Sequence, residues 1–304
     1  MNFRHVAIIG LGLLGGSIGL AVRHHLPELK TTGFDSDPAV RQRAAERGLA
    51  DTICETAAEA VKGADLVILC VPVGAMEGAA GEMRAALAAD AIVSDVGSSK
   101  LSVSNALARA LPDHQVIPAH PVAGTEDSGP DAGFASLFHR RWCIVTPPAD
   151  ADPTKVQKLV RFWQALGAMV DTMEPKHHDL VLAVTSHIPH LIAYTIVGTA
   201  SDLEQVTRGE VIKYSAGGFR DFTRIAASDP TMWRDVFLHN KDAVLEMLDQ
   251  FLTDLAVMRE AIRAGDGQTM FDAFSRTREI RRSIVAIGQD DARPDFGRKH
   301  NGDS

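Results

Sequence analysis

The sequence predicts an α/β protein in which an N-terminal Rossmann-type doubly wound sheet is followed by an all-helical domain. Three observations support this: a glycine-rich turn between a strand and a helix, a repeating strand–helix order in the first half, and only helical periodicity after Glu174-Pro175. We expect a nucleotide-binding domain at 1–174, a helical domain at 175–288 and a flexible tail at 289–304.

The glycine-rich turn has the spacing of a dinucleotide fingerprint. An apolar run, His5–Ile9, leads into Gly10-Leu11-Gly12-Leu13-Leu14-Gly15. In this motif Gly10 allows the tight turn, Gly12 lets the backbone approach a pyrophosphate, and Gly15 lets the helix pack closely on the strand. Free N–H groups at the helix N-terminus would bind the pyrophosphate.

Asp35 predicts which dinucleotide is bound. It lies at the end of the second predicted strand, twenty residues after Gly15. A carboxylate there accepts hydrogen bonds from a ribose diol and repels a 2′-phosphate, so NAD is favoured over NADP. The predicted NAD-binding residues are Gly10, Gly12, Leu13, Leu14, Gly15, Asp35, Val71, Pro72 and Ser98.

The first half contains short apolar runs that alternate with helical segments. The runs are mostly continuous rather than alternating in polarity, as expected for strands covered by helices on both faces. The predicted strands are His5–Ile9, Thr31–Phe34, Leu66–Val71, Ala91–Val96, Gln115–Ala119, Trp142–Thr146 and Ala168–Met173. The helices between them include Pro38–Arg47, Ala75–Ala88, Ser102–Leu111 and Thr154–Leu166.

The second half reads as long helices with apolar residues three and four positions apart. They cover Asp179–Thr199, Met232–Ala264 and Gly267–Ile287. Helices this apolar cannot easily bury every face within one chain, so we expect a homodimer formed through this half.

The composition is that of a soluble globular protein. The 304 residues are 45% hydrophobic and 23% charged, with a formal net charge of −8. This charge argues against a nucleic-acid or anionic-membrane partner, and no apolar run approaches the roughly 20 residues of a membrane span. The first residues lack a signal-peptide pattern. Three scattered cysteines suggest neither a disulfide framework nor a metal knuckle, so we expect a cytoplasmic protein.

Asp95-Val96-Gly97-Ser98-Ser99-Lys100 is the first of four polar clusters. It follows a predicted strand, so its side chains would lie near a bound dinucleotide. A simpler interpretation is that Ser98 or Ser99 caps the helix that follows, and both interpretations stay open.

The second cluster is Ala119-His120-Pro121-Val122-Ala123-Gly124-Thr125-Glu126. His120 ends an apolar strand at the carboxyl edge of the sheet, where substrates bind, and Pro121 holds it extended. A lone histidine is more often structural than catalytic, so position alone does not decide its role. Glu126 either pairs with a cation that binds substrate or is a solvated acid.

The third cluster contains His187 and His190, which are three residues apart and would share a helix face. Pro189 between them should kink or start the helix. Such a pair suggests zinc, but no cysteine or carboxylate completes a ligand set, so no metal is predicted.

The fourth cluster places Arg220, Asp221 and Arg224 after Gly217-Gly218. An arginine fork matches a carboxylate bidentately, and a neighbouring aspartate can hold it in position. The adjoining Ser228 and Asp229 have a simpler explanation as caps of the helix that begins near Pro230.

Taken together, the chain resembles the prephenate/arogenate dehydrogenase family from about Arg4 to Gly288. The resemblance rests on Gly-Leu-Gly-Leu-Leu-Gly-Gly-Ser, His-Pro-Val-Ala-Gly-Thr-Glu, Ser-His-Ile-Pro-His and Asp-Phe-Thr-Arg-Ile-Ala. It implies a Rossmann domain followed by a helical dimerisation domain. It also implies NAD-dependent oxidative decarboxylation of prephenate or arogenate, a small dianionic substrate, in tyrosine biosynthesis.

The resemblance also implies roles for single residues. His120 would take the proton of the ring hydroxyl, Ser98 would orient this histidine and the nicotinamide, and Arg224 would bind a substrate carboxylate with support from Asp221. The other implied pocket residues are Thr125, Glu126, His178, His187, His190 and Trp233.

Two other functions fit parts of the pattern. A β-hydroxyacid dehydrogenase has the same domain layout but uses a lysine after a glycine-rich segment, and no such segment surrounds Lys213. An NAD-binding redox sensor or scaffold would leave His120, His190 and Arg224 without a purpose.

Overall fold

The structure is a computed structural model that describes residues 3–125, 127–207, 213 and 217–286. The chain divides into two compact units, Met1–Met247 and Leu248–Ser304. The predicted tail at 289–304 and the site residue Glu126 lie outside the described residues.

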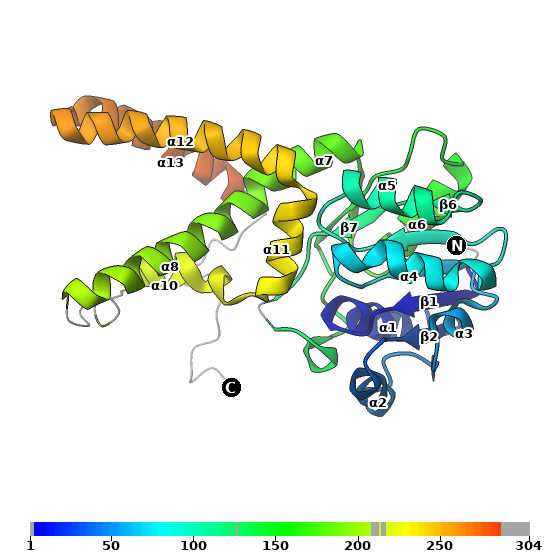
Figure 1. The fold of residues 1–304 in the computed structure, drawn as a ribbon. Coiled ribbons are helices and arrows are strands. Elements are labelled where there is room, and N and C mark those ends of the chain that lie inside the picture. Colours follow the sequence, from blue (N-terminus) through cyan, green and yellow to red (C-terminus); the bar gives the residue numbers. More distant parts are fainter. Residues whose placement is uncertain (1–2, 126, 208–212, 214–216, 287–304) are drawn as a thin grey trace. The chain divides into compact units, whose positions relative to one another are not determined.

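The first unit is built on a six-stranded sheet with the order β3-β2-β1-β4-β5-β6, in which every pair of neighbours is parallel. Figure 1 shows the sheet between its covering helices. This strand order is that of the dinucleotide-binding Rossmann fold, so the predicted fold class is confirmed. The strands are β1 (His5–Ile9), β2 (Lys30–Phe34), β3 (Thr52–Ile53), β4 (Leu66–Leu69), β5 (Ile92–Asp95) and β6 (Gln115–Val116).

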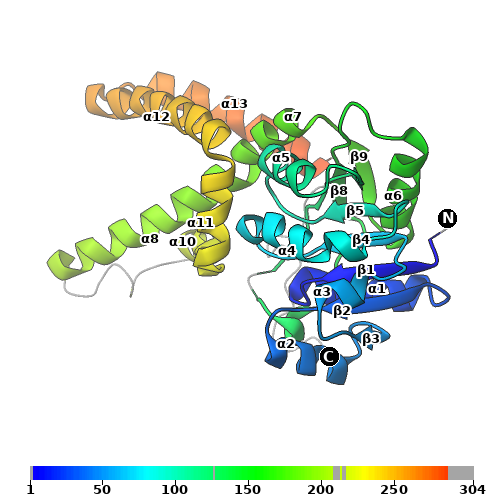
Figure 2. The same cartoon turned by 45° about the vertical axis from the view of Figure 1, so that its right-hand side comes forward.

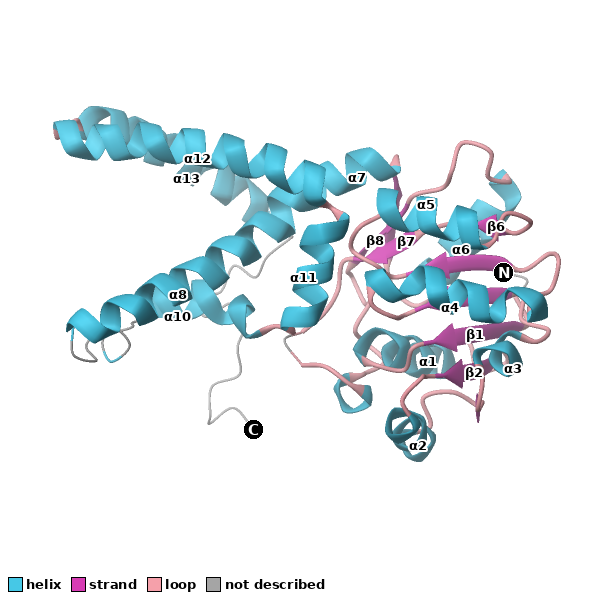
Figure 3. Cartoon of the chain, in the orientation of Figure 1, coloured by secondary structure: helices cyan, strands magenta, loops and turns pink. Residues whose placement is uncertain are grey.

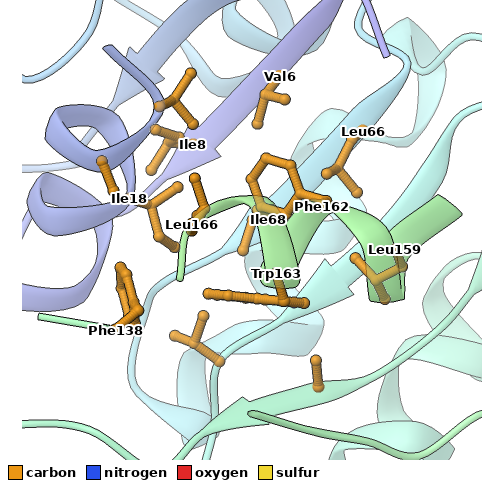
Figure 4. Packing of buried hydrophobic residues seen from close by; sticks show 14 of the residues in the cluster. Val6, Ile8, Ile18, Leu66, Ile68, Phe138, Leu159, Phe162, Trp163 and Leu166 are labelled. Carbon is orange, nitrogen blue, oxygen red and sulfur yellow. The ribbon is translucent and has the colours of Figure 1, made fainter. Parts of the chain in front are cut away.

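The two faces of the sheet bury separate apolar clusters, which explains why its strands are continuously apolar. In β1, Val6 and Ile8 point to one cluster, whereas Ala7 and Ile9 point to the other. The first cluster, shown in part in Figure 4, also contains Trp163. It receives helices α1 (Leu13–His25), α2 (Pro38–Arg47) and α6 (Pro153–Ala165). The second receives α3 (Ala57–Val61), α4 (Met76–Met83) and α5 (Leu101–Ala110).

The predicted strand Gln115–Ala119 is wrong in one respect, because it divides at Ile117-Pro118. β6 stays in the large sheet, whereas β7 (Ala119–Pro121) begins a three-stranded sheet of order β7-β8-β9, of which Figure 2 labels β8 and β9. Proline has no N–H to continue a ladder, which accounts for the break. The other members are β8 (Trp142–Val145), antiparallel to β7, and β9 (Met169–Thr172), parallel to β8.

Helices follow the second sheet, and Figure 3 shows no further strand in the described part of the chain. A π-helical turn, Ala183–His187, separates α7 (Pro175–Leu182) from α8 (Ile188–Thr207). The predicted helix Met232–Ala264 is interrupted at Asn240, giving α11 (Pro230–His239) and α12 (Lys241–Ala264). The sequence analysis also missed α10 (Gly217–Thr223) and the 3₁₀ turn Arg224–Ala227. The last described helix is α13 (Gly267–Ala286).

One helical run corrects the statement that no apolar segment has the length of a membrane span. Pro175–Asp202 is long and apolar enough to cross a membrane by length and composition. The same run carries Asp179 and His187, whose side chains hydrogen-bond to α5 and to Asn240. We therefore interpret it as a helix that packs against protein.

The second unit exposes many large apolar side chains on α12 and α13. The exposed residues are Leu252, Leu255, Val257, Ile262, Phe271, Phe274, Ile280 and Ile284. Scattered apolar residues are normal on a surface, but this number on two helices indicates a face that another protein surface covers.

Trp163 should be the most costly side chain to remove from the first cluster. It is fully buried and makes edge-to-face contacts with Phe138 and Phe162, whose ring centroids lie 5.4 and 5.7 Å away. We expect Trp163→Ala to lower the free energy of unfolding by about 3–5 kcal/mol. The matched control Trp142→Ala removes a tryptophan that is 36% exposed and should cost far less. Equal losses in urea titrations would contradict this account of the core.

Candidate active site

Sterics require two of the three fingerprint glycines, Gly10 and Gly15. Gly10 has a φ of +98°, and a Cβ there would lie 2.5 Å from the carbonyl oxygen of Cys70. A Cβ on Gly15 would lie 1.9 Å from the carbonyl oxygen of Gly10. Any side chain at either position would therefore push β1 and α1 apart from their neighbours.

The start of α1 suits a phosphate group. A Cβ added to Gly12 would meet nothing within 4 Å, and Gly12 provides no side-chain cap for the helix. The first N–H groups of α1 are therefore not capped by a side chain at Gly12, and they lie at the positive end of the helix dipole. This geometry fits the pyrophosphate of a dinucleotide, with Leu13 and Leu14 in the first turn.

Asp35 is held beside the same glycine-rich turn. One carboxylate oxygen accepts the N–H of Leu11 at 2.8 Å, and the other accepts the N–H of Asp37 at 3.0 Å. Each oxygen keeps a further lone pair for a ribose hydroxyl. Val71 and Pro72 lie just after β4, the strand that pairs with β1. Val71 is close to the glycine turn, since its Cγ1 would lie 3.1 Å from a Cβ on Gly10. The structure thus brings these residues to the carboxyl edge of the sheet.

His120 lies on β7 and is joined to the helical segment by a chain of hydrogen bonds. Its Nδ1 is 2.9 Å from Nε2 of His178, and Nδ1 of His178 is 2.9 Å from Oδ1 of Asp179. A carboxylate only accepts, so His178 carries its proton on Nδ1 and accepts at Nε2. His120 must then donate from Nδ1, which leaves the lone pair of its Nε2 available as a base.

Burial keeps this chain of imidazoles neutral. It lowers the pKa of His120 well below 6.5, and electrostatic repulsion from the protonated forms of His178 and His187 and from the Lys100 ammonium lowers it further. Burial also lowers the pKa of His178, against the opposing effect of Asp179. At pH 7 His120 is therefore an unprotonated base, as proton abstraction requires.

Asp179 also caps α5 from a distant part of the chain. Its two oxygens accept the N–H groups of Lys100 and Leu101 at 2.7 and 2.9 Å. The interpretation of Ser98 or Ser99 as the cap is thus wrong, because α5 has no cap from its own segment. Within the described residues Ser98 makes no hydrogen bond to His120; Ser98 follows β5 of the large sheet, whereas His120 lies within β7 of the second sheet.

His187 and Trp233 present two unsatisfied donors. Nδ1 of His187 lies 3.1 Å from Nδ2 of Asn240, an amide donor, so His187 carries its proton on Nε2. Burial lowers the pKa of His187 to about 4. Its Nε2 and the Nε1 of Trp233 are buried without a partner in the described chain. Such donors are costly unless an acceptor binds, which a substrate oxygen would supply.

His190 stacks on Trp233 and feels the positive charge of Arg224. Its ring stacks on the indole with 3.6 Å between centroids, and its Nδ1 lies 2.9 Å from the carbonyl oxygen of Ser186. Burial lowers the pKa of His190, and the charge of Arg224 lowers it further, so the two side chains are near each other. Arg224 opens a 3₁₀ turn that packs on α8, and Asp221 lies in the preceding α10.

Thr125 occupies a different setting from the other predicted residues. It lies in an exposed loop after β7, where its hydroxyl accepts the N–H of Asp127 at 3.2 Å. The structure does not place it against His120.

The sequence analysis assigned no individual role to four further residues, although two of them, Asp95 and Lys100, belong to its first polar cluster. Asp95, Lys100, Asp179 and Asn240 are all buried, and each hydrogen-bonds to a residue at or beside the histidines. The available signal was a charged residue inside an otherwise apolar context. Asp95 ends a buried strand, and Asp179 directly follows His178.

Known protein families match both parts of the chain. Residues 18–172 match the prephenate dehydrogenase nucleotide-binding domain, and residues 174–276 match the prephenate dehydrogenase dimerization domain. The chain belongs to the prephenate dehydrogenase family. Membership in this family decides against a β-hydroxyacid dehydrogenase and against a redox sensor.

Individual relatives agree over nearly the whole length. The cyclohexadienyl dehydrogenase of Zymomonas mobilis is 43% identical over 282 residues, which cover 93% of this chain and 96% of the relative. The prephenate dehydrogenase of Bacillus subtilis is 33% identical, over 91% of this chain and 75% of the relative. A crystal structure of prephenate dehydrogenase from Aquifex aeolicus, in complex with hydroxyphenyl propionate and NAD+, has a TM-score of 0.87 at 31% identity. It covers 93% of this chain and 99% of that one.

Asp179→Asn should impair turnover more than cofactor binding. The amide has only one acceptor oxygen, so the N–H of His178 and the N–H groups at the start of α5 compete for it. We expect kcat for prephenate to fall about 10–100-fold, as for other groups that orient a functional histidine. The exposed Asp171→Asn is the matched control, and NAD affinity is measured by calorimetry. An unchanged kcat would show that this hydrogen bond does not fix the imidazole.

Proposed function

We propose that this chain oxidises and decarboxylates prephenate to 4-hydroxyphenylpyruvate, or arogenate to tyrosine, with hydride transfer to NAD+ in tyrosine biosynthesis. The observation that carries the proposal is the chain His120–His178–Asp179, which ends in a neutral imidazole on β7, a strand that packs against β5 of the nucleotide-binding sheet. Family membership supports the reaction, and the nucleotide-binding match supports NAD as cofactor.

His120 would act on the 4-hydroxyl of the substrate ring. Its Nε2 takes the hydroxyl proton. Because Nδ1 carries the ring proton and donates it to His178, Nε2 is unprotonated before the reaction. Loss of the proton lets hydride leave C4, and loss of CO2 then makes the ring aromatic. NAD, held by the fingerprint and Asp35, supplies the hydride acceptor. Aromatisation drives the reaction, so the protein has mainly to position the reactants and provide one base.

The dianionic substrate would be held by donors from the helical segment. Arg224 would bind one carboxylate, with Asp221 supporting it, and a guanidinium suits a carboxylate because its donors form a fork. The unsatisfied N–H groups of His187 and Trp233 would donate to a second oxygen of the substrate. The roles of Ser98, Thr125 and Glu126 in the same pocket are part of this proposal.

We also propose that the nucleotide-binding and helical domains meet at 174/175, that the protein is a homodimer and that it is cytoplasmic. The exposed apolar side chains of α12 and α13 support a second copy as the covering surface. The description of the matching C-terminal family model as a dimerization domain supports it as well.

The activity is tested by the rise of NADH absorbance when prephenate is added to the purified protein with NAD+. We expect turnover by the native chain, and a fall in kcat of about 10²–10⁴-fold in His120→Asn with NAD affinity retained. His24→Asn, at the exposed end of α1, is the matched control. No NADH from the native chain would refute the function, whereas full turnover by His120→Asn would refute the base. Comparing kcat/KM for prephenate and arogenate shows which of the two substrates the protein prefers.

The pH profile follows from the lowered pKa of His120. The base works only when neutral, so kcat/KM falls as pH decreases through that pKa. Because burial holds the pKa below 6.5, the acidic limb should lie below pH 6.5. An acidic midpoint above 6.5 would contradict the assigned environment.

A further inference from the structure

Lys100 and Asp95 form an ion pair that solvent does not reach. Both side chains are 0% exposed, and Nζ of Lys100 hydrogen-bonds to Oδ2 of Asp95. Nζ also donates to the carbonyl oxygen of Ala119 at 2.7 Å. We refer to Lys100 and Asp95 as the buried pair. Lys100 cannot itself touch substrate, because its ammonium is enclosed.

The buried pair binds both backbone polar groups of the residue before His120. While Lys100 binds the carbonyl of Ala119, Oδ1 of Asp95 accepts the N–H of Ala119 at 3.3 Å. Oδ2 of Asp95 also accepts the N–H of Gly97 at 2.7 Å. β7 is an edge strand, and Pro118 before it interrupts the ladder, so the pair stands where a neighbouring strand would otherwise bind.

Lys100 is connected to His120 by a second route. The N–H of Lys100 donates to Asp179, which binds His178, which in turn binds the ring of His120. Lys100 is therefore connected to His120 in two ways. Its side chain binds the backbone of Ala119, and its N–H is connected to the His120 ring through Asp179 and His178. Position and orientation of the imidazole are thus both fixed from one residue.

Stability alone is a poor explanation for such a pair. Taking two charges out of water is costly, and apolar replacements of similar volume are often neutral or stabilising. A positional role explains why charged groups occupy this place, since only polar groups can satisfy the N–H and the carbonyl of Ala119.

We propose that Lys100 and Asp95 are positioning residues for the His120 imidazole. This inference rests on the proposed function and deepens it. It assigns the buried pair to turnover rather than to binding of either ligand.

The test compares two variants of the pair with a control for stability. Asp95→Asn/Lys100→Met removes both charges at similar volume, and Lys100→Gln keeps a shorter donor. The control is Val103→Ala, which removes buried apolar atoms from α5 without touching Ala119. Each protein is assayed with prephenate and NAD+, and its stability is measured by urea unfolding.

We expect kcat to fall about 10–100-fold in the double variant and less in Lys100→Gln, with KM and NAD affinity nearly unchanged. The acidic limb of kcat/KM should move to higher pH in both, because Lys100, with burial, His178 and His187, lowers the pKa of His120. Val103→Ala should lose stability but keep kcat and its pH profile.

Several outcomes would overturn the inference. One is turnover by folded pair variants equal to that of the native chain, with the pH limb unmoved. Another is a loss of kcat that Val103→Ala reproduces at equal loss of stability. Failure of both pair variants to fold would also overturn it, because the pair would then be a requirement of folding. An inactive native chain would instead refute the proposed function itself.

Discussion

The hydrogen bond between His120 and His178 joins β7 to α7 and holds the imidazole on which the proposed function depends. His120 belongs to a short edge strand beside the nucleotide-binding sheet, and His178 belongs to the first helix of the apolar segment that follows. In the proposed function, the base and the donors that bind substrate come from different elements. A bond of 2.9 Å between two buried rings fixes the His120 imidazole against α7.

The direction of the protons along this bond is a consequence of Asp179. The Asp179 carboxylate accepts the N–H groups of Lys100 and Leu101 at the start of α5. It also accepts a hydrogen bond from His178, which places the proton of that ring on Nδ1. The same direction then carries over to His120. Burial contributes by disfavouring a charged imidazole, and the positive charge of Lys100 acts in the same direction.

The sequence was sufficient for the parts of the fold that depend on local sterics and periodicity. Gly10, Gly15 and Asp35 lie in a strand–turn–helix–strand unit whose spacing determines their geometry, and the structure places them as that spacing predicts. The break at Pro118 and the interruption at Asn240 were missed because apolar periodicity continues through both positions. Local pattern does not reveal which sheet a short strand joins.

The histidines were identifiable only as separate candidates. His120 and His178 are 58 residues apart, so their contact depends on how the helices return to the sheet. Lys100 was harder still to recognise, because lysine is almost never fully buried unless it is paired. Its partners, Asp95 and the backbone of Ala119, are brought together by strand order rather than by spacing.

The central claim is that His120 presents an unprotonated Nε2 because its Nδ1 donates to His178. Nitrogen-15 NMR of the imidazoles in histidine-labelled protein at pH 7, assigned with His120→Asn, tests it most directly. We predict neutral His120 and His178 rings, both protonated at Nδ1 and bare at Nε2. A proton on Nε2 of His120, or a cationic ring at that pH, would contradict the account.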